Sequence, residues 1–104
     1  MHISKLIERY LITSHSGPPL TQASIKLYDN TGQIGTILYF PDGEDLPENR
    51  ITETGKVFFY KHFSHVSFDV DILRNEKPVY IQYNDRTKYG FISTSGEPVG
   101  EEEL

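Results

Sequence analysis

Apolar and polar residues alternate in two stretches, 56–61 and 79–83, and each stretch predicts a β-strand. In the first, Val57 and Phe59 lie on one face, while Phe58 and Tyr60 lie on the other. Because both faces are apolar, we expect this strand to be covered on two sides or to meet a partner. In the second stretch the expected core side chains alternate with Tyr80 and Gln82; they are Val79, Ile81 and Tyr83.

The segment between these strands fits two patterns. As a strand, its apolar residues alternate with Ser67, Asp69 and Asp71; as a helix, they form a stripe at spacings of three and four, made of Phe63, Val66, Val70 and Leu73. The charged residues at its end and the following Pro78 are typical of a connection from helix to strand. The sequence therefore predicts a helix over about 65–75, with Ser64 or Ser67 at its start. Phe68 and Ile72 would lie on its far face and need cover from a loop or a neighbouring subunit.

Residues 2–14 also fit two patterns. Their apolar side chains form a helical stripe, but residues 10–13 favour a strand. We expect a short N-terminal helix that leads into a first strand or is replaced by it. The following segment 15–22 contains Gly17, Pro18 and Pro19 and predicts a loop.

The clearest pair of strands covers 24–28 and 34–40, joined by turn residues 29–32, and predicts a β-hairpin. Within it, the side chains expected to face the core are Ile25, Leu27, Ile34, Leu38 and Phe40. A long acidic loop follows over 41–55, with a brief edge strand near 50–53. The last predicted strand, 88–94, has Tyr89 and Phe91 inward. The Gly- and Glu-rich segment 95–104 is expected to be a flexible acidic tail.

Together these elements predict a single domain over 1–104 of the α+β class, rich in strands. We expect a small antiparallel sheet or a partly closed barrel of five to six strands, with the helix packed on it.

Composition narrows the function classes. The chain has no cysteine, which excludes disulfides, thiolate catalysis and cysteine-ligated metals. Its net charge of −5 makes nucleic acid an unlikely partner and argues against binding to an anionic membrane. Since the N-terminal residues lack the pattern of a signal peptide, we expect a cytoplasmic protein.

Candidate chemistry is sparse. His62, His65 and Asp69 would share one helical face and are weak candidates for a metal site, with His15 arriving from elsewhere. The better interpretation is exposed or capping histidines, so we expect no metal and no other cofactor. The acidic run 42–45 lacks the distant Glu of a calcium loop and is expected to be a solvated loop. No phosphate-binding glycine motif or nucleophile turn occurs.

The tyrosines are the most suggestive feature. Tyr28, Tyr39, Tyr60 and Tyr80 are predicted to lie opposite the core positions, beside Phe58. Such rings either complete the edge of a core, form a protein interface, or stack nucleic-acid bases or sugars. The candidate interface or ligand residues are therefore Tyr28, Tyr39, Phe58, Tyr60, Phe68, Ile72 and Tyr80.

The leading hypothesis is a small, non-catalytic, cytoplasmic interaction domain that forms homo-oligomers or binds another protein. Its basis is apolar surface that one copy of this size would leave uncovered. One alternative is a ligand-binding β-barrel that uses the tyrosine-rich face for single-stranded nucleic acid or a sugar-like ligand. Another is a metal-dependent hydrolase centred on His62 and His65.

Overall fold

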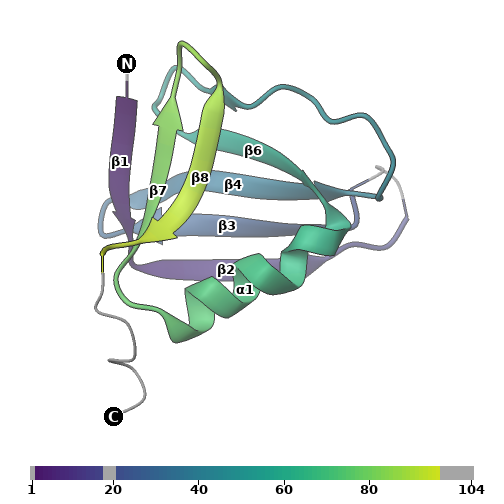
Figure 1. The fold of residues 1–104 in the computed structure, drawn as a ribbon, viewed down its shortest axis with the longest axis horizontal. Helices are drawn as coiled ribbons and strands as arrows, with labels where there is room; N and C mark the ends of the chain where they lie inside the picture. The colour runs from purple at the N-terminus through teal and green to yellow at the C-terminus, as the bar shows by residue number, and fades with distance from the viewer. Residues whose placement is uncertain (1, 18–20, 97–104) are drawn as a thin grey trace.

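Two sheets and one helix form the fold, as the ribbon of the computed structural model shows (Figure 1). The structure describes residues 2–17 and 21–96. The elements in chain order are β1 (His2–Ile7), β2 (Arg9–Ser14), β3 (Ala23–Asp29), β4 (Gly32–Phe40), β5 (Arg50–Ile51), β6 (Val57–His62), a 3₁₀ turn (Phe63–His65), α1 (Val66–Asn75), β7 (Val79–Asn84) and β8 (Tyr89–Thr94).

The strands pair as a five-stranded sheet of order β2-β3-β4-β6-β5 and a three-stranded sheet of order β1-β7-β8. β1 and β2 follow each other with only Glu8 between them, so the chain passes directly from one sheet into the other. In Figure 1, β7, β8 and α1 all lie in front of the strands of the five-stranded sheet. The helix and the smaller sheet therefore cover the same face of the larger sheet.

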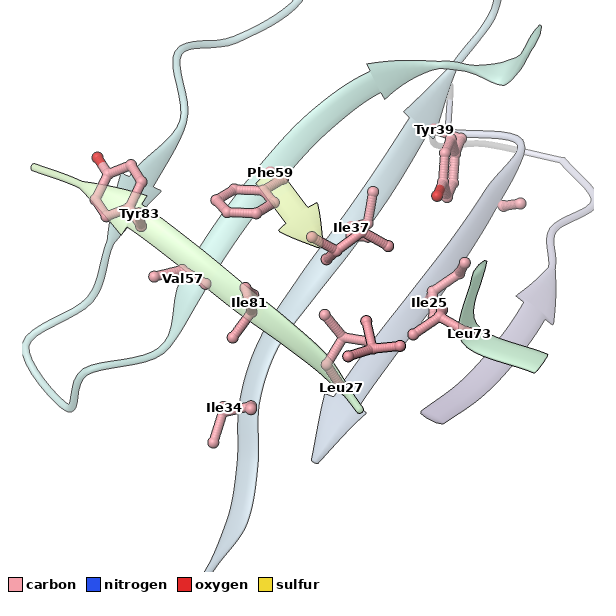
Figure 2. Close-up of a cluster of buried hydrophobic side chains, with 13 residues drawn as sticks. Ile25, Leu27, Ile34, Ile37, Tyr39, Val57, Phe59, Leu73, Ile81 and Tyr83 are labelled. Atoms are coloured by element: carbon pink, nitrogen blue, oxygen red, sulfur yellow. The ribbon is translucent and has the colours of Figure 1, made fainter. Parts of the chain in front are cut away.

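The core fills the space between these layers. Ile25, Leu27 and Ile37 of the large sheet are fully buried. Strand β7 of the small sheet crosses them and contributes Ile81 to the same cluster (Figure 2). α1 adds Leu73 to the same cluster. The other buried apolar side chains of this cluster are Ala23, Ile34, Tyr39, Val57, Phe59, Val79, Tyr83 and Ile92. The strand-rich α+β class expected from the sequence is confirmed, with one helix packed on the sheets.

The predicted hairpin is present as β3 and β4, with an irregularity in the register between Leu27 and Tyr28. The predicted helix is present as α1, but neither proposed serine caps it through its side chain. Instead, Asp42 of the long loop accepts a hydrogen bond from the backbone N–H of Ser64, at 3.0 Å. A long-range contact therefore satisfies the backbone just before the helix.

The helical interpretation of residues 2–14 is wrong, because this segment forms β1 and β2. β1 pairs with β7 and β2 pairs with β3, both antiparallel. In β1 the alternation places Ile3 and Ile7 against the core and leaves Leu6 42% exposed. The helical stripe would have buried Leu6 and Leu11, which the two sheets instead leave exposed.

Three details of the predicted architecture are also wrong. The described residues form eight strands rather than five or six, and the two sheets do not close into a barrel. The large sheet is not wholly antiparallel either, because β4 and β6 run parallel. A parallel pair needs a long crossover, and residues 41–56 provide it, including the short edge strand β5. Residues 97–104 of the predicted tail lie outside the described residues.

Two strands face the other way from the prediction. In β4, Ile37 and Tyr39 point into the core, whereas Leu38 and Phe40 lie on the outer face. In β8, Ile92 is buried and Tyr89 is 66% exposed. Ile34 of β4 is in the core as expected, because the register irregularity falls at this residue and separates it from Ile37. Within a regular stretch of strand, side chains alternate, so one residue's orientation fixes that of its neighbours.

We expect Gly90→Ala to lower the free energy of unfolding by about 2 kcal/mol, since overpacking a filled core forces strain. A Cβ atom on Gly90 would lie 2.2 Å from Cε1 of Phe59, whose ring is 1% exposed and has no room to move. Chemical denaturation monitored by circular dichroism measures the change. Gly96→Ala is the control, because a Cβ there meets nothing within 4 Å. Equal effects of the two substitutions would contradict this view of the core.

Candidate interaction surfaces

A buried polar cluster joins the helix to the large sheet. Asp69 of α1 is 1% exposed, and both its carboxylate oxygens accept hydrogen bonds from Nζ of Lys61 in β6, at 3.0 Å each. The hydroxyl of Tyr39 in β4 donates to Oδ2 of Asp69. Since a buried charge is tolerated only when it is paired and hydrogen-bonded, these three residues satisfy one another.

This cluster also explains why Tyr39 faces inward. α1 turns Val66, Val70 and Leu73 toward the sheets at helical spacing, and Asp69 lies on the same face. A phenol in β4 gives this carboxylate a second donor. Burial, and then the hydrogen bond to Asp69, raise the pKa of Tyr39 well above its usual range. The cluster holds the helix at a defined position on the sheet, because the polar atoms of its three residues hydrogen-bond to one another.

The candidate metal ligands are not brought together. Asp69 faces Lys61, while the Nε2 atom of His62 lies 2.8 Å from the backbone oxygen of Glu44. His65 is exposed, and His15 contacts Ser24 in β3, which β4 separates from β6. Within residues 2–17 and 21–96, no three His, Asp or Glu side chains converge in a way that could hold a metal ion.

The outer face of the three-stranded sheet carries no Asp, Glu, Lys or Arg. We call it the uncharged face; its outward positions are His2, Ser4, Leu6, Tyr80, Gln82, Asn84, Tyr89, Phe91 and Ser93. Leu6 lies directly opposite Tyr80 in the register. The rings of Tyr89 and Phe91 lie 5.3 Å apart between centroids, and Tyr89 is 66% exposed. The face therefore presents aromatic and aliphatic carbon among neutral polar groups.

The outer face of the five-stranded sheet differs in charge. We call it the basic face; its outward positions are Arg9, Leu11, Thr13, Ser24, Lys26, Tyr28, Thr36, Leu38, Phe40, Arg50, Phe58, Tyr60 and His62. The guanidinium of Arg9 lies 4.3 Å from the ring centroid of Tyr28, and that of Arg50 lies 4.3 Å from the centroid of Phe58. No Asp or Glu occupies an outward strand position here.

The residues predicted from sequence are divided among four places. Tyr28, Phe58 and Tyr60 share the basic face, and Tyr80 lies on the uncharged face. The other three lie elsewhere: Tyr39 is buried, Phe68 is 66% exposed on the helix, and Ile72 packs against the core. The expectation that Tyr39 is available for contact is wrong, because its side chain is fully buried in the core, whereas Ile72 is partly buried.

Several surface residues were missed by the sequence patterns. Leu6 and Arg9 were hidden by the helical interpretation of 2–14, and Tyr89 and Phe91 were assigned to the core. The available sequence signal for β1 was the spacing of Ile3 and Ile7, with the polar Lys5 at the inward position between them. It was too short to decide between a strand and a helix.

A groove of about 820 Å³ lies between the junction of β1 with β2 and the end of α1. Its floor includes Leu73 and Val79, and its rim carries Glu8, Arg74 and Glu76. The floor is apolar, and the rim groups of both signs are open to solvent. No set of polar side chains converges within it to define a ligand.

Comparison with protein-family models, with curated proteins and with solved structures finds no match to this chain. The fold defines a small strand-rich α+β protein. Among the described residues no helix has the length and apolar character needed to cross a membrane.

We expect Lys61→Met to reduce the free energy of unfolding by about 3 kcal/mol, because it leaves the Asp69 carboxylate buried without its cation. Tyr39→Phe should have a smaller effect, about 1–2 kcal/mol, since it removes one neutral donor. Urea denaturation of both variants measures the order. A larger effect of Tyr39→Phe would mean that the ion pair, whose lysine side chain is 26% exposed, contributes little.

Alkaline pH should destabilise the protein through its buried tyrosines. The folded state raises the pKa of Tyr39 and, through burial, that of Tyr83. A group with a raised folded-state pKa stabilises the fold below the unfolded pKa of about 10, and this stability is lost as pH rises above it. Unfolding followed between about pH 9 and 11 should show this decline. Tyr39→Phe should flatten it, whereas Tyr89→Phe at an exposed position should not.

Proposed function

We propose that this protein is a small, non-catalytic interaction domain that associates with a second copy of itself through the uncharged face. The single observation that carries the proposal is the charge-free, partly apolar composition of that outer sheet face. A quarter of the chain is charged (24%), yet all the outward positions of β1, β7 and β8 are neutral. Depletion of charge with enrichment of aromatic side chains is typical of the centre of an interface.

The symmetry of a self-contact favours such a surface. In a two-fold dimer the same patch meets itself, so a patch that carries charges of one sign brings like charges close to one another. The uncharged face avoids this repulsion. The basic face does not, because it would bring Arg9, Lys26 and Arg50 toward their counterparts. Between the two outer faces, the proposal therefore assigns self-association to the three-stranded sheet.

The exposed side chains have the chemistry that association requires. Leu6 and Tyr89 retain 42% and 66% of their surface in the single chain. Gln82 lies at the centre of the face. Its Oε1 atom is 3.1 Å from Nε2 of His2, and its Nε2 atom donates a hydrogen bond to the hydroxyl of Ser93. These polar groups are already paired within the sheet, so burying them against a partner would leave few unmet hydrogen bonds. The cysteine-free composition supports a cytoplasmic setting for the proposed dimer.

A non-catalytic role is supported by how the interior polar groups are used. Asp69, Lys61 and Tyr39 bond to one another rather than facing the groove beside α1. Reactive groups in a catalytic site converge on a space that a substrate can enter. Here the cluster stabilises the contact between helix and sheet.

We expect the native protein to have about twice its 12.0 kDa chain mass at micromolar concentration. Tyr89→Glu should shift it to the monomer, because each copy would then place a carboxylate in the contact. Size-exclusion chromatography with light scattering measures the mass, and circular dichroism verifies that the variant remains folded.

Phe68→Glu is the matched control. Phe68 is 66% exposed, as Tyr89 is, but it belongs to α1 and not to the uncharged face. This variant should remain dimeric. A monomeric native protein would overturn the proposal, and dissociation by Phe68→Glu alone would move the interface to the helix.

A further inference from the structure

Basic and acidic side chains are unevenly distributed over the surface of this protein. The chain as a whole has a net charge of −5. The outward strand positions of the five-stranded sheet nevertheless carry Arg9, Lys26 and Arg50 and no carboxylate. Glu8 precedes Arg9, but its Oε2 accepts a hydrogen bond from the backbone N–H of Asn30 at the β3–β4 turn. A local excess of positive charge therefore lies on one face of an acidic protein.

The three cations of this face are not engaged by acids. All three are exposed, and none forms an ion pair with another described residue. Two of them lie over aromatic rings, Arg9 over Tyr28 and Arg50 over Phe58. The two guanidinium groups are thus held in place by rings, and Arg50 also donates from Nε to the hydroxyl of Tyr60. All three cations remain without an acidic partner among the described residues and can meet an anion.

The register places these groups in a continuous band across the sheet. Lys26 lies beside Thr36, Thr36 beside Phe58, and Phe58 beside Arg50. With neighbouring strands about 4.8 Å apart, Lys26 and Arg50 are separated by about 14 Å. This row therefore holds Phe58 between two cations, and the pair Arg9 and Tyr28 lies in the adjacent row of the same face. A flexible chain with repeating negative charges and flat apolar groups matches this arrangement.

We propose that the basic face binds single-stranded nucleic acid. Arg9, Lys26 and Arg50 would contact phosphates, while bases stack on the rings or on the guanidinium planes above them. A duplex is a poorer fit, because a five-stranded sheet is too broad to enter a groove that admits a helix or a two-stranded ribbon. An acidic peptide could use the cations but would leave the aromatic band without a role. This site is separate from the proposed dimer interface, which uses the other sheet.

Since the chain as a whole is acidic and the basic face has three cations, we expect a modest affinity that depends on salt concentration. Three phosphate contacts give a dependence of log K on log salt with a slope of roughly −2 for a single strand. Affinity should therefore be modest and best observed at low ionic strength, where phosphate contacts are least screened.

The test measures fluorescence anisotropy of a labelled oligothymidylate of about 20 nucleotides, titrated with the full chain at about 20 mM salt. Saturable binding with the stated salt slope is expected, and the matching duplex should bind several-fold more weakly. Lys26→Glu should weaken binding about tenfold by replacing a phosphate contact with repulsion. Tyr28→Leu should weaken it by a similar factor, because it removes a stacking surface.

Arg86→Glu is the control for charge alone. Arg86 is exposed in the β7–β8 turn of the smaller sheet and is not one of the outward positions of the basic face, and the substitution changes the net charge by the same amount. It should reduce binding less than twofold. Equal losses in Lys26→Glu and Arg86→Glu would overturn the proposal, as would no binding at low salt. Polyglutamate competing as well as the oligonucleotide, with Tyr28→Leu unaffected, would instead assign the face to an acidic protein segment. Tyr89→Glu should retain binding, which separates failure of this proposal from failure of self-association.

Discussion

The contact of Asp69 with Lys61 and Tyr39 sets the arrangement of the layers. A carboxylate at 1% exposure is tolerated only where its partners are in reach. Those partners come from β6 and β4, the parallel pair at the centre of the large sheet, while the carboxylate comes from the helix. Any sliding of α1 along the sheet would separate the charges inside an apolar core. The ion pair and the phenol therefore select one position for the helix, which apolar packing alone would leave less defined.

Once the helix and the small sheet occupy one face of the large sheet, the rest of the surface follows. Both sheets contribute one face to the common core, and each keeps a second face directed outward. These outer faces differ in charge, because one carries Arg9, Lys26 and Arg50 and the other carries no charged residue. Each face also carries half-buried tyrosine rings, such as Tyr28 on the basic face and Tyr80 on the uncharged face. One compact core thus supports two chemically distinct surfaces, and the two proposals assign them different partners.

Sequence patterns succeeded where local chemistry was decisive. The turn residues between β3 and β4 predicted the hairpin, and the charged end of α1 followed by Pro78 predicted where the helix stops. They failed where long-range pairing overrides a local preference. Residues 2–14 satisfy a helical stripe, yet β7 and β3 provide the hydrogen bonds that make them strands. The prediction of the site residues failed for a similar reason, since Tyr39 and Phe91 were assigned to the wrong faces of their strands.

The sequence by itself determined the class of the fold, the hairpin, the helix and the absence of cysteine chemistry. These depend on residue type, on turn geometry and on spacing along a few neighbouring residues. Only the tertiary structure decided which face of each strand is buried, that β4 and β6 run parallel, and that Asp69 meets Lys61 and Tyr39. The physical reason is that a strand presents two nearly equivalent faces. The choice between them depends on distant partners, here a helical carboxylate and a second sheet.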